Sequence, residues 1–247
     1  QEALLAWYRR VQRPLPWRLD PSPWSILLSE ILLQQTQMER GISYHAKLLE
    51  RFPTLQAMAE SDVDEVLHLW QGAGYYSRAR RLHALSRQVV EDYNGVLPSE
   101  YEELLELPGI GPYTAAAVAS IAFSRPVACV DGNIRRVMAR QTNQEDPSSQ
   151  QIQSYADEQL LESAPGDWNQ AMMELGALVC KPRRPACKEC PVVDTCLGRS
   201  RADVLPLAKT TKKKKIEYNC VVRIDEKGLP ELHQRPNNGL FAGLWGP

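Results

Sequence analysis

The chain has 247 residues, of which 43% are hydrophobic and 24% are charged, and its formal net charge is −1. This length can bury the core of one large domain or of two smaller ones, and no uninterrupted apolar run of about 18 residues is present to cross a membrane. Residues 1–10 lack the basic, apolar and small-residue pattern of a secretory signal. We therefore expect a soluble protein with no membrane partner, cytoplasmic in a bacterium or nuclear in a eukaryote.

Apolar residues at three- and four-residue spacing predict a succession of helices in the first part of the chain. The clearest windows are residues 24–40, 62–70, 77–93, 101–107, 113–123 and 168–179. Pro, Gly and Asn interrupt the pattern between these windows, and no alternating strand pattern precedes residue 216. The sequence therefore predicts an all-α domain over residues 1–198.

The composition changes after residue 198. Residues 199–215 are polar and then lysine-rich, which is typical of a linker. Residues 217–224 form the first strand-like run, and residues 225–228 predict a turn. About thirty residues cannot bury an independent core, so we interpret residues 216–247 as the incomplete start of a second domain.

The basic residues are unevenly distributed. Lysines gather between residues 209 and 215, and a second group follows Cys180, comprising Lys181, Arg183, Arg184 and Lys188. A local basic stripe can contact phosphates even when acidic faces cancel the total charge. A solvated linker or surface explains the same residues equally well, so the charge pattern leaves both interpretations open.

Four of the six cysteines form a tight cluster with the spacing Cys180-x6-Cys187-x2-Cys190-x5-Cys196. Nothing in the sequence indicates an oxidising compartment, so a metal explains the cluster better than disulfides do. Four thiolates suit a tetrahedral zinc ion and a [4Fe–4S] cluster equally well. The other two cysteines, Cys129 and Cys220, are expected to be buried small residues.

Residues 107–115 (LPGIGPYTA) join two predicted helices. Gly109 and Gly111 permit a tight turn that exposes backbone N–H groups at the start of the following helix. Such amides, together with the helix dipole, suit a phosphate oxygen. A glycine pair between helices is also compatible with an ordinary turn.

Two carboxylates are candidates for chemistry. Glu30 lies on a predicted helix that is apolar nearly all round, so burial should raise its pKa and keep it protonated near neutral pH. A structural glutamate that meets a neighbouring arginine would show the same pattern. Asp131, followed by Gly132, suits a helix N-cap, and this role is compatible with a catalytic one.

These motifs together resemble a known family. The 6-2-5 cysteine spacing resembles the iron–sulfur loop of the endonuclease III superfamily, and LPGIGPYTA resembles the helix-hairpin-helix of DNA glycosylases. Residues 29–37 (SEILLQQTQ) closely resemble the MutY-type adenine glycosylase signature. Matches at residues 15–18, 70–80 and 173–180 extend the resemblance over about the first 200 residues. Residues 239–245 resemble the start of the Nudix-like 8-oxoguanine recognition domain of that family.

The resemblance implies a helix-hairpin-helix DNA glycosylase fold, in which a six-helix module carries the hairpin and the N-terminal helix packs with an iron–sulfur module. It implies a [4Fe–4S] cluster bound by Cys180, Cys187, Cys190 and Cys196. The bifunctional relatives have a lysine nucleophile where this chain has Tyr113, so we expect a monofunctional enzyme that stops after base removal.

The implied reaction removes adenine opposite 8-oxoguanine, or opposite G, after the nucleotide leaves the base stack. Glu30 would protonate adenine N7. Asp131, kept ionised by donors such as Asn133 and Tyr113, would stabilise the oxocarbenium ion or trap it covalently.

The resemblance also implies the contacts with double-stranded DNA, for which we expect a monomer. Gln35, with Gln34 and Thr36 beside it, would enter the duplex, and Tyr75 would wedge near the lesion. The adenine pocket would be lined or flanked by Arg13, Leu15, Trp17, Arg18 and Leu33, although a core role suits the aliphatic ones nearly as well. The alternatives are a thymine or uracil mismatch glycosylase of the same superfamily and a noncatalytic iron–sulfur DNA-binding protein.

Overall fold

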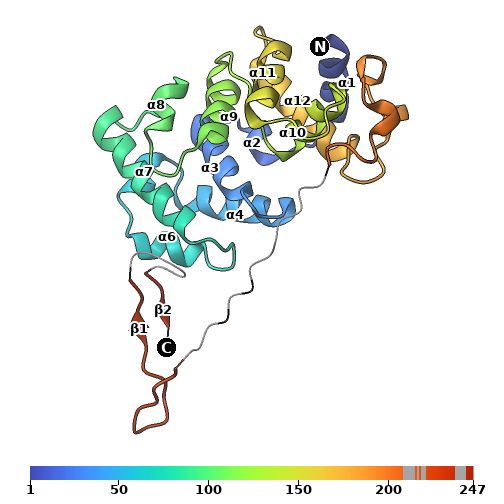
Figure 1. Ribbon diagram of the computed structural model, residues 1–247. Helices are drawn as coiled ribbons and strands as arrows, with labels where there is room; N and C mark the ends of the chain where they lie inside the picture. The colour runs from blue at the N-terminus through green and yellow to red at the C-terminus, as the bar shows by residue number, and fades with distance from the viewer. Residues whose placement is uncertain (208–214, 216, 218–220, 237–242, 247) are drawn as a thin grey trace. The chain divides into compact units, whose positions relative to one another are not determined.

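A computed structural model describes residues 1–207, 215, 217, 221–236 and 243–246 (Figure 1). It divides into two units, Gln1–Leu207 and Ala208–Pro247, and each is described by itself. Within the described part of the chain, no helix is long and apolar enough to cross a membrane.

All regular secondary structure in the described residues of the first unit is helical, as the sequence predicts. Its α-helices are α1 (Glu2–Val11), α2 (Pro16–Leu19), α3 (Pro23–Leu33), α4 (Met38–Arg51), α5 (Leu55–Ala59), α6 (Val63–Leu69), α7 (Ser77–Tyr93), α8 (Tyr101–Leu105), α9 (Pro112–Phe123), α10 (Gly132–Gln141), α11 (Ser149–Gln159) and α12 (Pro165–Leu178). Three short 3-10 helices follow, at Cys187–Glu189, Val193–Thr195 and Arg199–Arg201.

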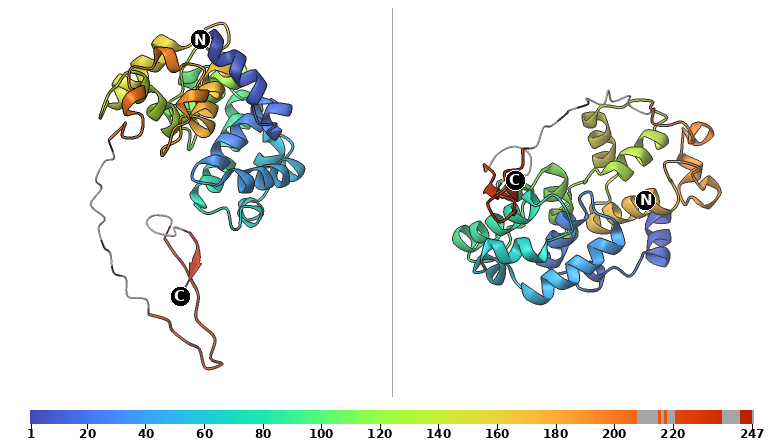
Figure 2. Two further views of the ribbon diagram at one scale, coloured as in Figure 1. Left: turned by 90° about the vertical axis from the view of Figure 1, so that its right-hand side faces the viewer. Right: turned by 90° about the horizontal axis from the view of Figure 1, so that it is seen from below.

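The helices enclose two hydrophobic cores, one on each side of α9. The first core lies among α3–α9, and the second joins α1 to α10, α11 and α12. Helix α9 supplies Ala115 and Val118 to the first core and Ala116 and Ala117 to the second. Figures 1 and 2 show α4–α8 on one side of α9 and α10–α12 on the other. We call these two halves the first and the second lobe.

The predicted helix over residues 24–40 is interrupted. Ser22 caps α3 by accepting a hydrogen bond from the backbone N–H of Ser25, but α3 ends at Leu33 and α4 begins only at Met38. The backbone of Gln35 is left-handed, with φ of 60°, which no α-helix accommodates. The glutamines and the threonine of the signature therefore form a turn between two helices, in which Gln35 is exposed and Gln34 and Thr36 are half-buried.

The end of the first unit corrects the predicted linker. Residues 199–207 pack against the second lobe, with Ala202 and Leu205 buried. The side chain of Arg140 donates from Nε to the Leu205 carbonyl at 2.8 Å, which fixes this segment through an interaction that local composition does not indicate. Residues 208–214, the lysine-rich part of the predicted linker, lie outside the described residues.

The second unit contains a short two-stranded sheet among its described residues. Strand β1 (His233–Gln234) pairs antiparallel with β2 (Trp245–Gly246). The predicted turn at 225–228 is present, because the amide of Gly228 donates to the carbonyl of Asp225 at 3.0 Å. Of the predicted strand 217–224, residues 218–220 are not described, and the described part forms only a bridge from Ile224 to Pro230. Residues 239–242 of the Nudix-like match also lie outside the described residues.

Candidate active site

A cavity of about 510 Å³ lies between the two lobes and is lined by both candidate carboxylates. Most of the side chains singled out in the sequence meet around it: Arg13, Leu15, Trp17, Arg18, Glu30, Leu33, Gln34, Gln35, Thr36, Tyr113, Asp131 and Asn133. Tyr75, the two hairpin glycines and the four clustered cysteines lie elsewhere. The cavity therefore joins residues from five separate segments of the sequence.

Glu30 projects from α3 and is only 9% exposed. Its Oε2 accepts a hydrogen bond from the Tyr113 hydroxyl at 2.9 Å. Burial raises the pKa of Glu30 to about 7; the nearby charge of Asp131 adds to this rise, and the Tyr113 hydrogen bond opposes it. Glu30 is thus an acid that holds its proton close to neutral pH.

Asp131 is the N-cap of α10. Its Oδ1 accepts from the backbone N–H of Ile134 at 2.7 Å, and its Oδ2 accepts from Nδ2 of Asn133 at 2.9 Å. Burial raises the pKa of Asp131, and these two hydrogen bonds act in the opposite direction. The positive end of the α10 dipole also favours its carboxylate form. Asp131 therefore has more support for a negative charge than Glu30 has.

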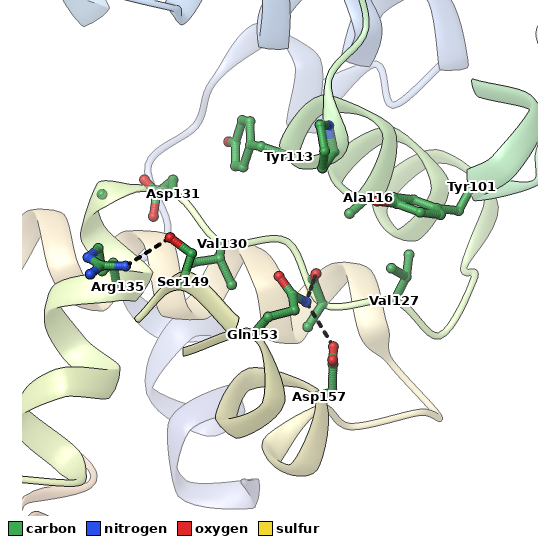
Figure 3. A pocket seen from close by; sticks show the side chains of 13 residues that line it. Tyr101, Tyr113, Ala116, Val127, Val130, Asp131, Arg135, Ser149, Gln153 and Asp157 are labelled. Carbon is green, nitrogen blue, oxygen red and sulfur yellow. Dashed lines mark hydrogen bonds between the residues drawn. The ribbon is translucent and has the colours of Figure 1, made fainter. Parts of the chain in front are cut away.

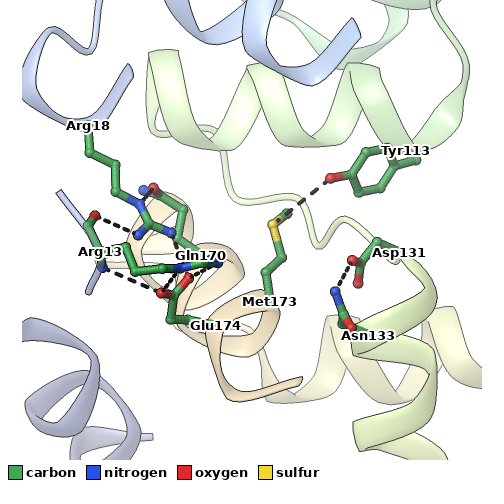
Figure 4. Close-up of polar contacts among 8 residues, drawn as sticks. All are labelled: Arg13, Arg18, Tyr113, Asp131, Asn133, Gln170, Met173 and Glu174. Carbon is green, nitrogen blue, oxygen red and sulfur yellow. Dashed lines mark hydrogen bonds and ion pairs between the residues drawn. The ribbon is translucent and has the colours of Figure 1, made fainter. Parts of the chain in front are cut away.

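Tyr113 lies in the first turn of α9, and its hydrogen bond corrects one expectation. The hydroxyl donates to Glu30 rather than to Asp131. It also lies 3.9 Å from Sδ of Met173, a contact drawn in Figure 4. Burial raises the pKa of Tyr113 well above its usual range, so the hydroxyl stays protonated. No lysine amine occupies this position.

Glu174 is a cavity residue that the sequence analysis did not single out. It is 1% exposed on α12, and its carboxylate binds Nε of Arg13 at 2.7 Å and Nη2 of Arg18 at 3.1 Å. Burial alone would raise the pKa of Glu174, but the hydrogen bonds and charges of the two arginines lower it. Figure 4 shows this cluster, with Gln170 accepting from Arg18 Nε at 3.0 Å. The feature of the sequence that could have identified Glu174 is a charged residue within the apolar run of residues 171–179.

The fold requires glycine at only one of the two hairpin positions, Gly109 and Gly111. Gly109 has φ of 83°, and a Cβ there would lie 2.8 Å from the Cβ of Arg81, so the turn requires glycine. Gly111 caps α9, and a Cβ on it would meet nothing within 4 Å. The fold therefore does not demand glycine at residue 111.

A second cavity, of about 580 Å³, lies on the other side of Asp131 (Figure 3). It shares Tyr113, Asp131 and Gly132 with the first cavity. Its polar wall comes from α11, where Gln153 donates to Asp157 at 2.9 Å. No local sequence pattern indicates this cavity, because α11 approaches Asp131 only through the tertiary fold.

Comparison with known proteins places these two lobes and their cavity in a family. Residues 28–162 match the model of the HhH-GPD superfamily base excision DNA repair proteins. The chain belongs to this superfamily. It also belongs with the adenine DNA glycosylases, because it is 36% identical to the adenine DNA glycosylase of Buchnera aphidicola over 99% of this chain and 72% of that protein.

Other relatives extend the comparison. The chain is 45% identical to the human adenine DNA glycosylase, covering 98% of this chain and 56% of that protein, and 38% identical to the rat protein, covering 58% of it. The chain thus spans little more than half the length of these mammalian relatives. A thermostable thymine-DNA glycosylase superposes with a TM-score of 0.76 at 28% identity, over 81% of this chain and 94% of that one. An endonuclease III–DNA complex superposes with a TM-score of 0.70 at 24% identity, over 81% of this chain and 93% of that one.

The four clustered cysteines of this HhH-GPD chain lie around one apolar cavity in the second lobe, and none of them forms a disulfide. Among the described residues, no group of three His, Cys, Asp or Glu side chains converges closely enough to hold a single metal ion. Zinc needs all four sulfurs at about 2.3 Å from one point. In a [4Fe–4S] cluster each cysteine binds a different iron, so the sulfurs stand further apart. Four free cysteines around one apolar cavity are a donor set that fits an iron–sulfur cluster.

Proposed function

We propose that this chain is a monofunctional DNA glycosylase that removes adenine mispaired with 8-oxoguanine, or with G. The observation that carries the proposal is the meeting of Glu30 and Asp131 in one cavity between the lobes, with different hydrogen-bond partners. The adenine DNA glycosylase relatives support the choice of adenine.

The cavity suits a base that has left the helix stack. A glycosidic bond inside a duplex is inaccessible to protein side chains, so the nucleotide must rotate outward. A volume of about 510 Å³ lies within the usual range for small-ligand sites. Leu15, Trp17 and Leu33 supply apolar surface for a purine ring, and Arg13 and Arg18 supply donors.

Glu30 would supply the proton that makes adenine a neutral leaving group. A pKa of about 7 leaves a substantial fraction protonated at neutral pH while keeping the proton acidic enough to transfer. Proton transfer to adenine N7 withdraws electrons from the glycosidic bond. The electron pair of that bond then departs with the base.

Asp131 would stabilise the positive charge that the sugar develops as the bond breaks. The amide of Ile134 and the side chain of Asn133 hold its carboxylate in place before the reaction starts, so little reorganisation is needed. Water then adds to the sugar carbon and releases a proton, either directly or by displacing the carboxylate of Asp131 from a covalent ester. Tyr113 offers no amine, so no Schiff base forms at this position and the strand stays intact.

Cys180, Cys187, Cys190 and Cys196 would hold a [4Fe–4S] cluster. When bound, this group supplies a structural anchor for the loop that carries Lys181, Arg183, Arg184 and Lys188. That loop and the hairpin before α9 would contact phosphates.

The test is single-turnover base release from four duplexes containing A opposite 8-oxoguanine, A opposite G, T opposite G, and only normal pairs. The proposal expects excision of adenine from the first two, with alkali needed to cut the strand. Prompt strand cleavage without alkali, or efficient borohydride trapping of a protein–DNA adduct, would contradict the monofunctional assignment.

A thymine mismatch glycosylase is the second candidate, favoured by the superposition with the thermostable thymine-DNA glycosylase. Thymine departure requires no proton at a purine N7, so a buried acid such as Glu30 has no evident task in it. Release of thymine from the T opposite G duplex, without release of adenine, would establish this alternative.

A further inference from the structure

Two exposed side chains, one at the rim of the cavity and one outside it, lie on tight turns. Gln35 occupies the turn between α3 and α4, and Tyr75, which is 61% exposed, occupies the turn before α7. Both have left-handed backbones, with φ of 60° and 49°. Non-glycine residues adopt this conformation only where the surrounding structure enforces it. Something must therefore hold both turns in shape.

Arg78 holds both of them. It lies in the first turn of α7, is 9% exposed, and its guanidinium reaches between the turns. Nη1 donates to the carbonyls of Ile31 (2.9 Å), Leu32 (2.9 Å) and Gln34 (2.5 Å). Nη2 donates to Thr36 Oγ1 and to the carbonyls of Ala73 and Gly74, each at 3.2 Å.

The chemistry of this position calls for arginine. The last carbonyls of α3 lack partners within their own helix, and a cation at a helix C-terminus satisfies them favourably. A planar guanidinium presents two separate amino groups, so one can serve the Gln34–Thr36 turn while the other serves Ala73 and Gly74. The guanidinium also lies over the ring of Tyr75, 5.6 Å from its centroid, which couples it directly to one exposed side chain.

We propose that Arg78 is a positioning residue that fixes Gln35 and Tyr75 at one separation, so that both side chains enter the duplex together at the mispair. This inference rests on the proposed function. Arg78 contacts neither base nor sugar in this scheme, and its effect on excision passes entirely through the two turns.

The first test measures DNA opening without any excision. The duplex carries a tetrahydrofuran abasic analogue opposite 8-oxoguanine, with 2-aminopurine as the neighbouring base, whose fluorescence rises when it unstacks. The unaltered chain and the control Arg87→Gln, which removes an exposed arginine from the same helix, should raise the fluorescence equally. Arg78→Gln should lose most of the rise. Arg78→Lys keeps the charge but cannot span both turns, so it should lose part of it.

These outcomes separate the inference from the proposed function. If the unaltered chain raises the 2-aminopurine fluorescence but releases no adenine, the proposed function is wrong. The fluorescence of the Arg78 variants then still tests the role of Arg78. Arg78→Lys and Arg78→Gln both matching the unaltered chain would overturn the inference. So would a duplex that the unaltered chain does not open. If Arg78→Gln does not fold, the fluorescence of Arg78→Lys alone tests the inference. Thermal unfolding then checks that Arg78→Lys is folded.

The second test distinguishes positioning from general stability. A double-mutant cycle compares Arg78→Gln in the unaltered chain with Arg78→Gln in a Gln35→Ala, Tyr75→Ala background. If Arg78 acts through these side chains, its substitution should slow excision at least about ten-fold in the first case and several-fold less in the second. Equal losses in both backgrounds would show that Arg78 only supports the fold, and the inference would be wrong.

Discussion

The hydroxyl of Tyr113 donates a hydrogen bond to Oε2 of Glu30 across 2.9 Å, from α9 to α3. The residue that stands where the bifunctional relatives have a lysine therefore touches the proposed acid. A tyrosine hydroxyl stabilises the carboxylate of Glu30 and so holds its pKa below the value that burial alone would set. This contact links the tyrosine at residue 113 to the protonation state of Glu30.

The first prediction concerns the pH dependence of excision. Only protonated Glu30 can donate to adenine, so the single-turnover rate should fall as pH rises through about 7. Tyr113→Phe removes the hydrogen bond that lowers the pKa of Glu30, so the midpoint of this fall should move to higher pH. A rate that rises through the same range, or a midpoint that Tyr113→Phe moves downward, would count against this assignment.

The second prediction concerns folding stability. The folded pKa of Glu30 is raised from 4.5 to about 7, so the folded state binds a proton that the unfolded state has already lost between these values. The stabilisation that Glu30 contributes is fully present below about pH 4.5 and is lost as the pH rises through about 7. Glu30→Gln removes this pH dependence. The free energy of unfolding of the variant, relative to that of the unaltered chain, should therefore rise by on the order of 3 kcal/mol between pH 4 and pH 8. Urea unfolding at several pH values measures it. A constant difference would show that burial does not perturb Glu30.

The third prediction concerns the buried ion cluster at Glu174. Glu174→Gln removes the buried carboxylate that neutralises the partly buried Arg13 and Arg18, so we expect a loss of about 2 kcal/mol in the free energy of unfolding. The matched control is Asp167→Asn, which breaks the exposed pair with Arg9 and should cost less than about 1 kcal/mol. Equal effects in thermal or urea unfolding would refute the structural role of this cluster.

The fourth prediction concerns the four clustered cysteines. The purified chain should be brown, should absorb broadly near the blue edge of the visible spectrum, and should contain iron and labile sulfide in equal amounts. Replacing Cys190 with serine should bleach this absorbance. A colourless chain with one zinc ion and full activity would show that the cluster assignment is wrong.

The sequence supports the parts of this structure that depend on local pattern. The apolar spacing of residues 77–93 predicts α7 with both of its ends, and the buried environment of Glu30 follows from its apolar helix. The cavity residues could be named in advance only through resemblance to a family, because spacing does not reveal which segments meet in space.

The features that sequence reasoning missed depend on long-range contacts. Arg78 holds carbonyls more than forty positions away, and Glu174 is paired with arginines near the start of the chain. At the break after Leu33 the same distant arginine binds the carbonyls of Ile31, Leu32 and Gln34. Periodicity alone therefore predicted one helix where the chain makes two. The partner of Tyr113 likewise depends on how α9 packs against α3, which no local signal encodes.

The most direct measurement compares single-turnover excision from an A opposite 8-oxoguanine duplex by the unaltered chain, Glu30→Gln and Asp131→Asn. Asparagine caps a helix as well as aspartate does, so Asp131→Asn should fold normally. If one residue supplies the proton and the other the counter-charge, each variant should lose ~10²–10⁴-fold in rate while still binding the duplex. Excision by Glu30→Gln at the rate of the unaltered chain would contradict the proposed mechanism.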